Sequence, residues 1–137
     1  MTTTGGGVKM GARRLLALLF AQLPTNREYT TDAGKWSEAL LRLRERHKEY
    51  EDLLEELTFS RRPGRRAYSG EVSKFLMRLQ AGGVAQLVNP GIVRLQIRPE
   101  LQREMYEHHA RKVDEHMLSI TNQLAAELAK DSSLWVS

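Results

Sequence analysis

Four arginines fall within one stretch of eleven residues, SRRPGRRAYSG, which runs from Ser60 to Gly70. A Pro-Gly pair separates them into two pairs, so the chain is expected to turn in the middle of the stretch. Arginine side chains bind phosphates and carboxylates through planar, charged hydrogen bonds. The stretch therefore predicts either a surface that grips an anionic partner or a solvated hinge.

The positive charge continues downstream of this stretch. Between Arg61 and Arg98 the chain has eight basic residues and one acid, Glu71, which is a net charge of +7. Because the whole chain has a formal net charge of +4, the remainder must carry −3. A nucleic-acid surface requires such a concentration of charge, since neutralised phosphates release condensed counterions. An acidic protein partner is the alternative explanation.

The middle of this basic window predicts a helix with a polar outer face. Apolar residues recur there at helical spacing from Val72 to Leu79, and Ser69 is a suitable N-cap. The residues between them face outward, and Arg, Lys, Gln and Ser side chains hydrogen-bond to base edges or phosphates. The candidate nucleic-acid-binding residues are Arg61, Arg62, Arg65, Arg66, Ser73, Lys74, Met77, Arg78, Gln80 and Arg94.

The other reactive residue types do not combine into a catalytic or metal site. The chain has no cysteine, which excludes disulfides, thiol catalysis and cysteine-zinc sites. His109 and His116 are seven residues apart on one expected helix, too far to share a tetrahedral ion. Adjacent acids such as Glu55 and Glu56 diverge on a helix. We therefore expect no enzyme activity, no metal and no cofactor.

The elements before the basic window are expected to be helical. The apolar run in KMGARRLLALLFAQLP is too short to span a membrane and lacks a signal cleavage pattern, so it predicts a buried helix over Val8–Gln22. A second helix is expected over Asp32–Leu57, with Thr31 or Asp32 as its N-cap. Its apolar seam comprises Trp36, Leu40, Leu43, His47, Tyr50, Leu54 and Leu57.

The elements after the expected third helix are a hairpin and a last helix. Two β-branched runs flank Asn89-Pro90-Gly91, which predicts a β-hairpin with these residues as its turn. Pro99 suits the first turn of a helix that extends to about Lys130, roughly 45 Å in length. A helix this long extends beyond what a domain of this size can cover.

The long C-terminal helix predicts a homodimer in which the same helix of two chains forms the contact. Its expected dimer interface is the apolar seam Met105, His109, Val113, Met117, Ile120, Leu124 and Leu128. The alternative is a monomer whose C-terminal helix folds back on the first two helices.

The segment YSGEVSKFLMRLQAGGVAQLVNPGIVRLQI, from Tyr68 to Ile97, resembles the second half of a winged helix-turn-helix domain. In that family a Ser or Thr opens the recognition helix, as Ser69 would here. A glycine ends the helix, and an apolar residue such as Val84 begins the first wing strand. The resemblance implies that the third helix and the hairpin contact double-stranded DNA. A weaker likeness is to the Panacea-type antitoxin domain, where Tyr-Ser also opens a helix that ends in glycine before a hairpin.

These observations predict a mainly α-helical chain with a small β-hairpin: a winged-helix-like core with a long second helix and a long C-terminal helix. Residues 1–7 are expected to be a flexible tail, and residues 8–137 a single domain. Within it we expect the N-terminal helices over 8–58, the helix and wing hairpin over 69–98, and the dimerisation helix over 99–130.

The function predicted from the sequence is that of a small dimeric transcriptional regulator. It would bind double-stranded DNA through the third helix and the basic loop, in the cytoplasm and without membrane contact. The alternative is a non-enzymatic protein-interaction module, an assembly subunit or an antitoxin-like partner, that binds no nucleic acid.

Overall fold

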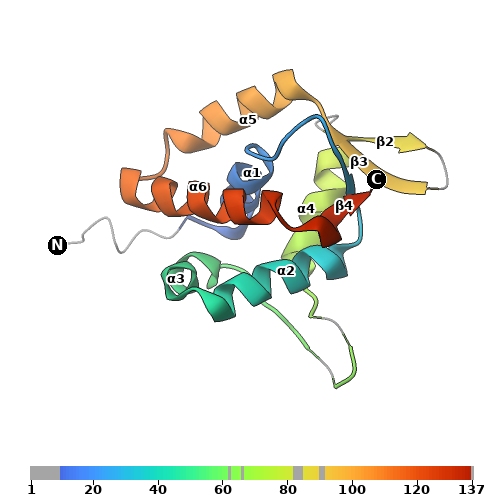
Figure 1. The fold of residues 1–137 in the computed structure, drawn as a ribbon. Coiled ribbons are helices and arrows are strands. Elements are labelled where there is room, and N and C mark those ends of the chain that lie inside the picture. Colours follow the sequence, from blue (N-terminus) through green and yellow to red (C-terminus); the bar gives the residue numbers. More distant parts are fainter. Residues whose placement is uncertain (1–9, 62, 66, 82–84, 90–91, 137) are drawn as a thin grey trace.

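The computed structural model describes residues 10–61, 63–65, 67–81, 85–89 and 92–136. The chain is mainly helical and has a small antiparallel sheet, as the sequence predicts (Figure 1). The predicted tail, the hairpin turn at Pro90 and the glycine stop at Gly82 lie outside the described residues. Among the described residues, no helix combines the length and apolar character that crossing a membrane requires.

The first helix, α1 (Ala12–Phe20), lies at the centre of the core. Every residue from Leu15 to Phe20 is buried, so this helix has no polar face over two turns. The predicted buried helix is therefore confirmed, with tighter bounds. The Phe20 ring lies 4.6 Å from the ring of Trp36 and 5.3 Å from that of Phe75, measured between centroids. These contacts join α1 to the second helix and to the helix of the basic window.

The second helix, α2 (Ala33–Arg46), is shorter than predicted. Asp32 is its N-cap and accepts a hydrogen bond of 2.9 Å from the Gly34 backbone N–H. The helix ends where His47 adopts an extended backbone (φ −128°, ψ 110°), so the predicted continuous helix to Leu57 is wrong. The chain continues as a 3-10 turn, η2 (Lys48–Tyr50), and a short helix, α3 (Glu51–Leu54).

The break at His47 has a packing reason. Leu53 and Leu54 are both buried, although neighbouring positions on a helix point in different directions. The turn at His47 gives α3 its own direction and lets both leucines reach the core.

The sheet has four antiparallel strands in the order β2-β3-β1-β4. Strands β2 (Ala85–Asn89) and β3 (Ile92–Ile97) form the predicted hairpin. Strand β1 (Glu28–Thr30), from the α1–α2 connection, pairs with β3, so that Tyr29 lies opposite Leu95. Sequence analysis did not predict β1, because three residues give too short a pattern to detect.

The predicted long C-terminal helix is two helices. Helix α5 (Pro99–Ala110) begins at Pro99 as predicted, and helix α6 (Glu115–Ala129) follows a turn. Asp114 is the N-cap of α6 and accepts a hydrogen bond of 2.8 Å from the Met117 backbone N–H. The prediction of one continuous helix to about Lys130 is therefore wrong. An N-capping aspartate followed by a glutamate was the signal in the sequence that marks this boundary.

Both C-terminal helices fold back onto α1 (Figure 1). The buried Gln102 side chain of α5 donates hydrogen bonds to the Phe20 and Leu23 carbonyls, at 3.0 and 2.7 Å. After α6, a 3-10 turn, η3 (Ser132–Leu134), leads into strand β4 (Trp135–Val136) at the sheet edge beside β1. The C-terminal half thus covers the core that α1 and α2 begin.

Candidate nucleic-acid interface

The helix of the basic window, α4 (Gly70–Ala81), follows the predicted spacing. Its apolar residues Val72, Phe75, Leu76 and Leu79 are buried. Ser69 is buried at its N-terminus, and its Oγ accepts a hydrogen bond of 3.4 Å from the Val72 backbone N–H. The predicted N-cap is therefore confirmed. This inner face fixes which side of α4 is turned to solvent.

Glu71, the single acid of the basic window, belongs to this cap. Its Oε1 accepts hydrogen bonds from Ser69 Oγ at 2.9 Å and from the Thr58 backbone N–H at 3.1 Å. Burial opposes ionisation of Glu71, but these hydrogen bonds outweigh it and lower the pKa of the carboxyl group. The Glu71 carboxylate is therefore hydrogen-bonded at the start of α4 and does not add negative charge to the outer face of the helix.

The outer face of α4 presents cations without acids. Lys74 and Arg78 are exposed one turn apart, and Met77 beside them is 66% exposed. Ser73 and Gln80 are half-buried at the margins of this face. Neither Lys74 nor Arg78 forms an ion pair with a described acidic residue. We call Ser73, Lys74, Met77, Arg78 and Gln80 the α4 face.

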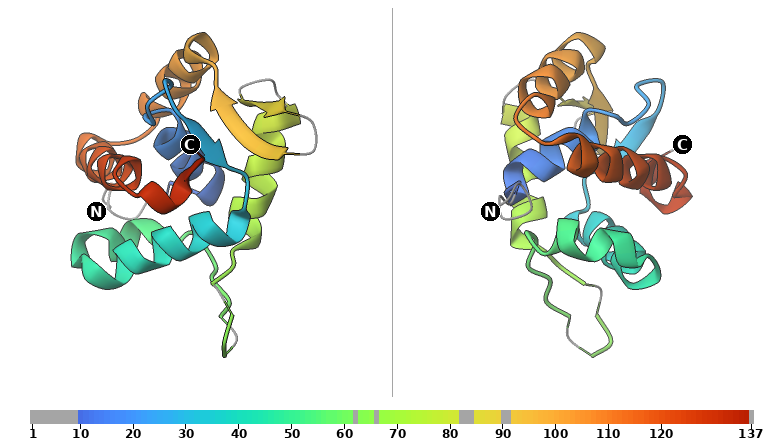
Figure 2. Two further views of the ribbon diagram at one scale, coloured as in Figure 1. Left: turned by 45° about the vertical axis from the view of Figure 1, so that its right-hand side comes forward. Right: turned by 90° about the vertical axis from the view of Figure 1, so that its left-hand side faces the viewer.

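Ser60 and Tyr68 close a projecting loop through one isolated antiparallel bridge, and we call this loop the ribbon. These two residues exchange backbone hydrogen bonds of 2.8 Å in each direction. Gly64 near the tip has a positive φ of 75°, a conformation that L side chains rarely adopt. Arg65 next to it is exposed, whereas Arg62 and Arg66 lie outside the described residues. Figure 2 shows the ribbon extending away from the body of the molecule.

Two residues of α2 hold the base of the ribbon. The Glu38 carboxylate accepts hydrogen bonds from Arg61 Nη2 at 2.6 Å and from the Ala67 backbone N–H at 3.3 Å. The hydrogen bond from Arg61 is the main reason that the pKa of Glu38 is lowered. The residue before Glu38 also takes part: the buried Ser37 Oγ accepts a hydrogen bond of 3.0 Å from the Ser69 backbone N–H. Helix α2 thus positions both the ribbon and the start of α4.

Arg61 therefore has a structural partner that sequence analysis did not find. Its guanidinium group pairs with Glu38, which is 23 residues away in the chain. No local pattern identifies such a pair, because neither residue stands out from the charged residues around it. Arg65 at the tip has no described acidic partner and is the better candidate for a free cation.

The ribbon and the hairpin flank the α4 face. The ribbon leads into one end of α4, and the β2-β3 hairpin lies beside the other end (Figure 2). Arg94 lies on β3 opposite Thr30, and its side chain is outside the described structure. At the end of β3, Arg98 Nη2 lies 3.5 Å from the Glu100 carboxylate. The arrangement offers an elongated surface whose central cations, Lys74 and Arg78, have no acidic partner among the described residues.

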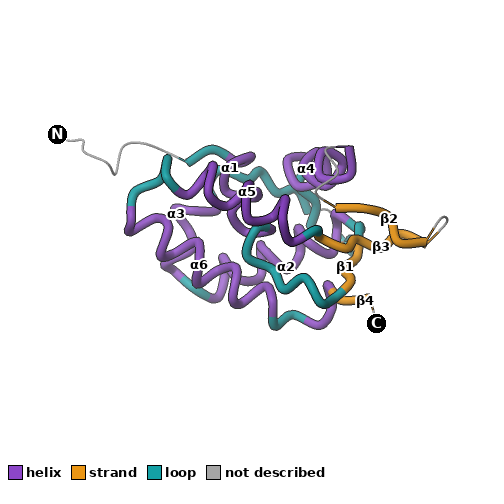
Figure 3. The backbone as a smooth tube through the Cα atoms, turned by 90° about the horizontal axis from the view of Figure 1, so that it is seen from above, coloured by secondary structure: helices purple, strands orange, loops and turns teal. Residues whose placement is uncertain are grey.

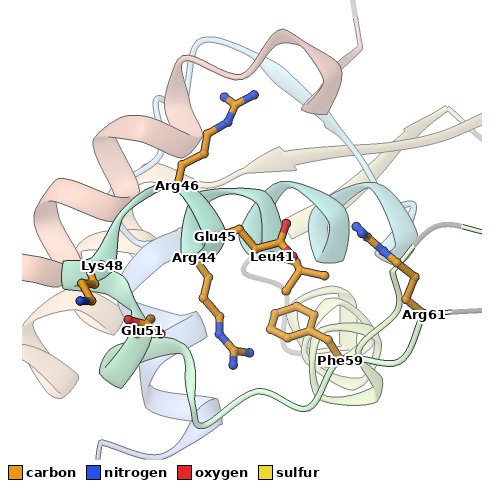
Figure 4. A pocket seen from close by; sticks show the side chains of 8 residues that line it. All are labelled: Leu41, Arg44, Glu45, Arg46, Lys48, Glu51, Phe59 and Arg61. Atoms are coloured by element: carbon orange, nitrogen blue, oxygen red, sulfur yellow. The ribbon is translucent and has the colours of Figure 1, made fainter.

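A hollow of about 680 Å³ lies between α2 and the segment that follows α3. Figure 4 shows the Phe59 ring facing Leu41, with Arg44 and Arg61 on either side of it. Arg46 also lines the hollow by position, but its side chain extends in the opposite direction in this view. The wall also includes Glu45 and Glu51, so an acidic segment with an apolar side chain would contact the part formed by Phe59, Leu41 and Arg44.

The predicted dimer-interface residues differ in how deeply they are buried within the chain. Leu124 and Leu128 are buried within the chain, in the core that α6 forms with α1. Met105, Val113, Met117 and Ile120 are partly buried and pack at the edge of the same core. His109 is half-buried and accepts a hydrogen bond of 3.3 Å from Arg14 Nε. The seam is therefore largely used within one chain, on two helices and not on one.

No group of three or more metal-ligating side chains lies together in the part of the chain that the structure describes. A scan against protein-family models, a search of curated proteins and a search of solved structures each found no match for this chain.

Proposed function

We propose that this protein is a winged-helix DNA-binding protein that acts as a small regulator in the cytoplasm. Helix α4 would enter the major groove, where its cations would contact the phosphates that border the groove as well as base edges, and the ribbon and the hairpin would contact the backbone on either side. The observation that carries the proposal is the α4 face. It presents Lys74 and Arg78 to solvent, while Glu71 is held at the helix N-cap.

The elements around α4 support this proposal. A capped helix followed by a two-stranded hairpin is the pattern on which the resemblance to winged helices rests. The break at His47 leaves α2 with 14 residues, which suits a positioning helix better than the predicted helix to Leu57. The ribbon between Ser60 and Tyr68 is then an insertion before the recognition helix.

The α4 face has the side-chain chemistry that reads DNA. Lys and Arg donate to guanine O6 and N7 or to phosphate oxygens, and Gln recognises adenine. Met77 is large, apolar and 66% exposed, which suits contact with a thymine methyl group. Because the Met77 side chain is exposed between Lys74 and Arg78, it does not contribute to packing in the core of the protein.

Binding to mixed-sequence duplex DNA, measured by fluorescence anisotropy over a series of salt concentrations, tests the proposal. Binding should be detectable at low salt and weaken linearly on a logarithmic plot as salt rises. Absence of binding at low salt would contradict the proposal.

A second candidate function is the binding of an acidic protein segment, which the hollow beside α2 favours. Phe59 and Leu41 offer apolar contact, and Arg44 offers a charge for a carboxylate. This function predicts no DNA binding and a specific loss of partner binding on Phe59→Ala. The two functions are therefore separated by the same salt-dependent DNA assay.

A further inference from the structure

A second hollow, of about 570 Å³, lies between the start of α1 and the end of α5. Arg13 and Arg14 of α1 and His108 and His109 of α5 contribute four nitrogen-bearing side chains to its wall. None of the described residues that line it is acidic. We call this hollow the α1–α5 pocket. Figures 1 and 3 place the end of α5 on the side of the molecule away from α4 and the hairpin.

The side chains of this pocket contact one another without a carboxylate. Arg14 Nε donates to His109 Nδ1, which must therefore be unprotonated in this contact. The ring of His108 stands edge-on to that of His109, with centroids 4.8 Å apart. Lys112 Nζ lies 3.4 Å from His108 Nε2. Arg13, Arg14 and Lys112 form no ion pair with an acidic residue in the described part of the chain.

The electrostatic environment of His109 reflects this uncompensated charge. Burial lowers the pKa of His109 to about 4, and the charges of its neighbours act in the same direction. Those neighbours are His108, Arg14, Lys112 and Arg13. All four are basic residues, so the charge that the pocket lacks is negative.

We propose that the α1–α5 pocket binds a small molecule that carries a phosphate group. A phosphate accepts bidentate hydrogen bonds from arginine and would neutralise the charges of Arg13 and Arg14. The cavity volume lies within the range of about 300–1,000 Å³ typical of small-molecule sites, so it has room for an organic body beside the phosphate. Met10 and Ala12 line the pocket and offer apolar contact to that body.

The backbone of α1 adds further donors to those of the side chains. Gly11 at the N-cap has no side chain that could cap the helix, so within the described residues the first-turn backbone N–H groups of α1 have no side-chain cap. Such groups bind anions when cationic side chains stand beside them. The ligand would thus contact both helices that form the pocket.

Phenyl phosphate is a suitable probe, because it combines a phosphate with a compact apolar body. Its binding is measured by calorimetry and by the NMR signals of the histidine rings, at constant ionic strength. We expect saturable binding and a rise in the pKa of His109, since a bound anion offsets its cationic neighbours. The ring of His47, at the end of α2, should not respond.

Variants test whether the pocket itself binds the probe. The double substitution Arg13→Gln and Arg14→Gln should raise the Kd at least tenfold. The control, Arg103→Gln with Lys130→Gln, removes the same charge at two exposed positions outside the pocket and should change the Kd less than twofold. Arg13→Gln alone, at an exposed position, should raise the Kd severalfold if the double variant does not fold.

Three outcomes would overturn the proposal. They are shifts that do not saturate, an equal loss of affinity in the Arg103 and Lys130 control, and binding of benzoate as tight as that of phenyl phosphate. The last result would show that the pocket does not select a phosphate. DNA binding by α4 does not enter this experiment, so either proposal can fail without the other.

Discussion

Ser69 links three parts of the proposed interface through its backbone and its side chain. Its backbone N–H donates to Ser37 of α2, and its Oγ donates to Glu71 and accepts from Val72. The start of α4 therefore depends on one buried residue. Sequence analysis found the cap, because capping is local in the chain. It did not find Ser37, whose role depends on a contact 32 residues away.

We predict that Ser69→Ala lowers the free energy of unfolding by about 0.5–2 kcal/mol, the usual cost of losing an N-cap. The buried backbone N–H of Val72 would lose its acceptor, and Glu71 would lose a donor. Urea denaturation measures the change. Ser119→Ala, at an exposed position of α6, is the matched control and should have little effect. Equal stability of the two variants would contradict the described role of Ser69.

His109 makes stability depend on pH. Its pKa of about 4 in the folded chain lies below the ordinary value of 6.5, so between these values only the unfolded chain binds the proton. The free energy of unfolding should therefore fall as the pH decreases from 6.5 toward 4. Urea denaturation between pH 5 and 6.5 measures this slope, above the pH at which the carboxyl groups of Glu38 and Glu71 titrate.

His109→Gln is the variant that tests this pH dependence. It should flatten the slope, because glutamine binds no proton. His47→Gln, at the C-terminal end of α2, is the control. In this variant the contribution of His109 to the pH slope should be unchanged. Parallel slopes in wild type and His109→Gln would contradict the pH prediction.

At the scale of elements, the helix boundaries were harder to predict than the helices. The faces of α1 and α4 follow from their spacing, and the hairpin follows from its β-branched strands. The break before Asp114 has a local signal, the N-capping aspartate followed by a glutamate. The break at His47 precedes a 3-10 turn with no side-chain cap, so no comparable local pattern marks it.

The ribbon depends on Glu38 for its attachment to α2. We predict that Glu38→Gln increases the rate of tryptic cleavage after Arg65, because a neutral amide holds Arg61 and the ribbon base less firmly. Limited proteolysis followed by mass spectrometry measures the rate. Glu45→Gln, at an exposed position of the same helix, should cleave like wild type. An unchanged rate in Glu38→Gln would show that the ion pair does not restrain the ribbon.

At the scale of the whole molecule, folding back of the C-terminal helices changes the basis of the dimer prediction. That prediction assumed one helix too long for its own domain to cover, whereas the structure has two shorter helices packed on α1. This is the packing that the alternative, a monomer, expected. The homodimer stays a prediction, because the partly buried Val113 and Ile120 remain at the edge of the core.

Light scattering at micromolar concentration tests the dimer prediction. A dimer has twice the chain mass of 15.7 kDa, and Val113→Asp with Ile120→Asp should reduce the mass to one chain. Circular dichroism of the variant checks that it remains folded. A wild-type mass of one chain would contradict the dimer prediction and leave the DNA-binding proposal intact.

The salt dependence of DNA binding shows whether the cations of the α4 face contact DNA. The slope of log K against log salt should decrease in magnitude by up to about two in Lys74→Ala with Arg78→Ala, since each lost phosphate contact removes roughly 0.9. Arg103→Ala with Arg111→Ala removes two exposed charges from the α5 side and is the control for net charge. If the α4 face binds DNA, the control should keep the wild-type slope. An unchanged slope in the α4 variant, or an equal decrease in both variants, would contradict DNA binding by the α4 face.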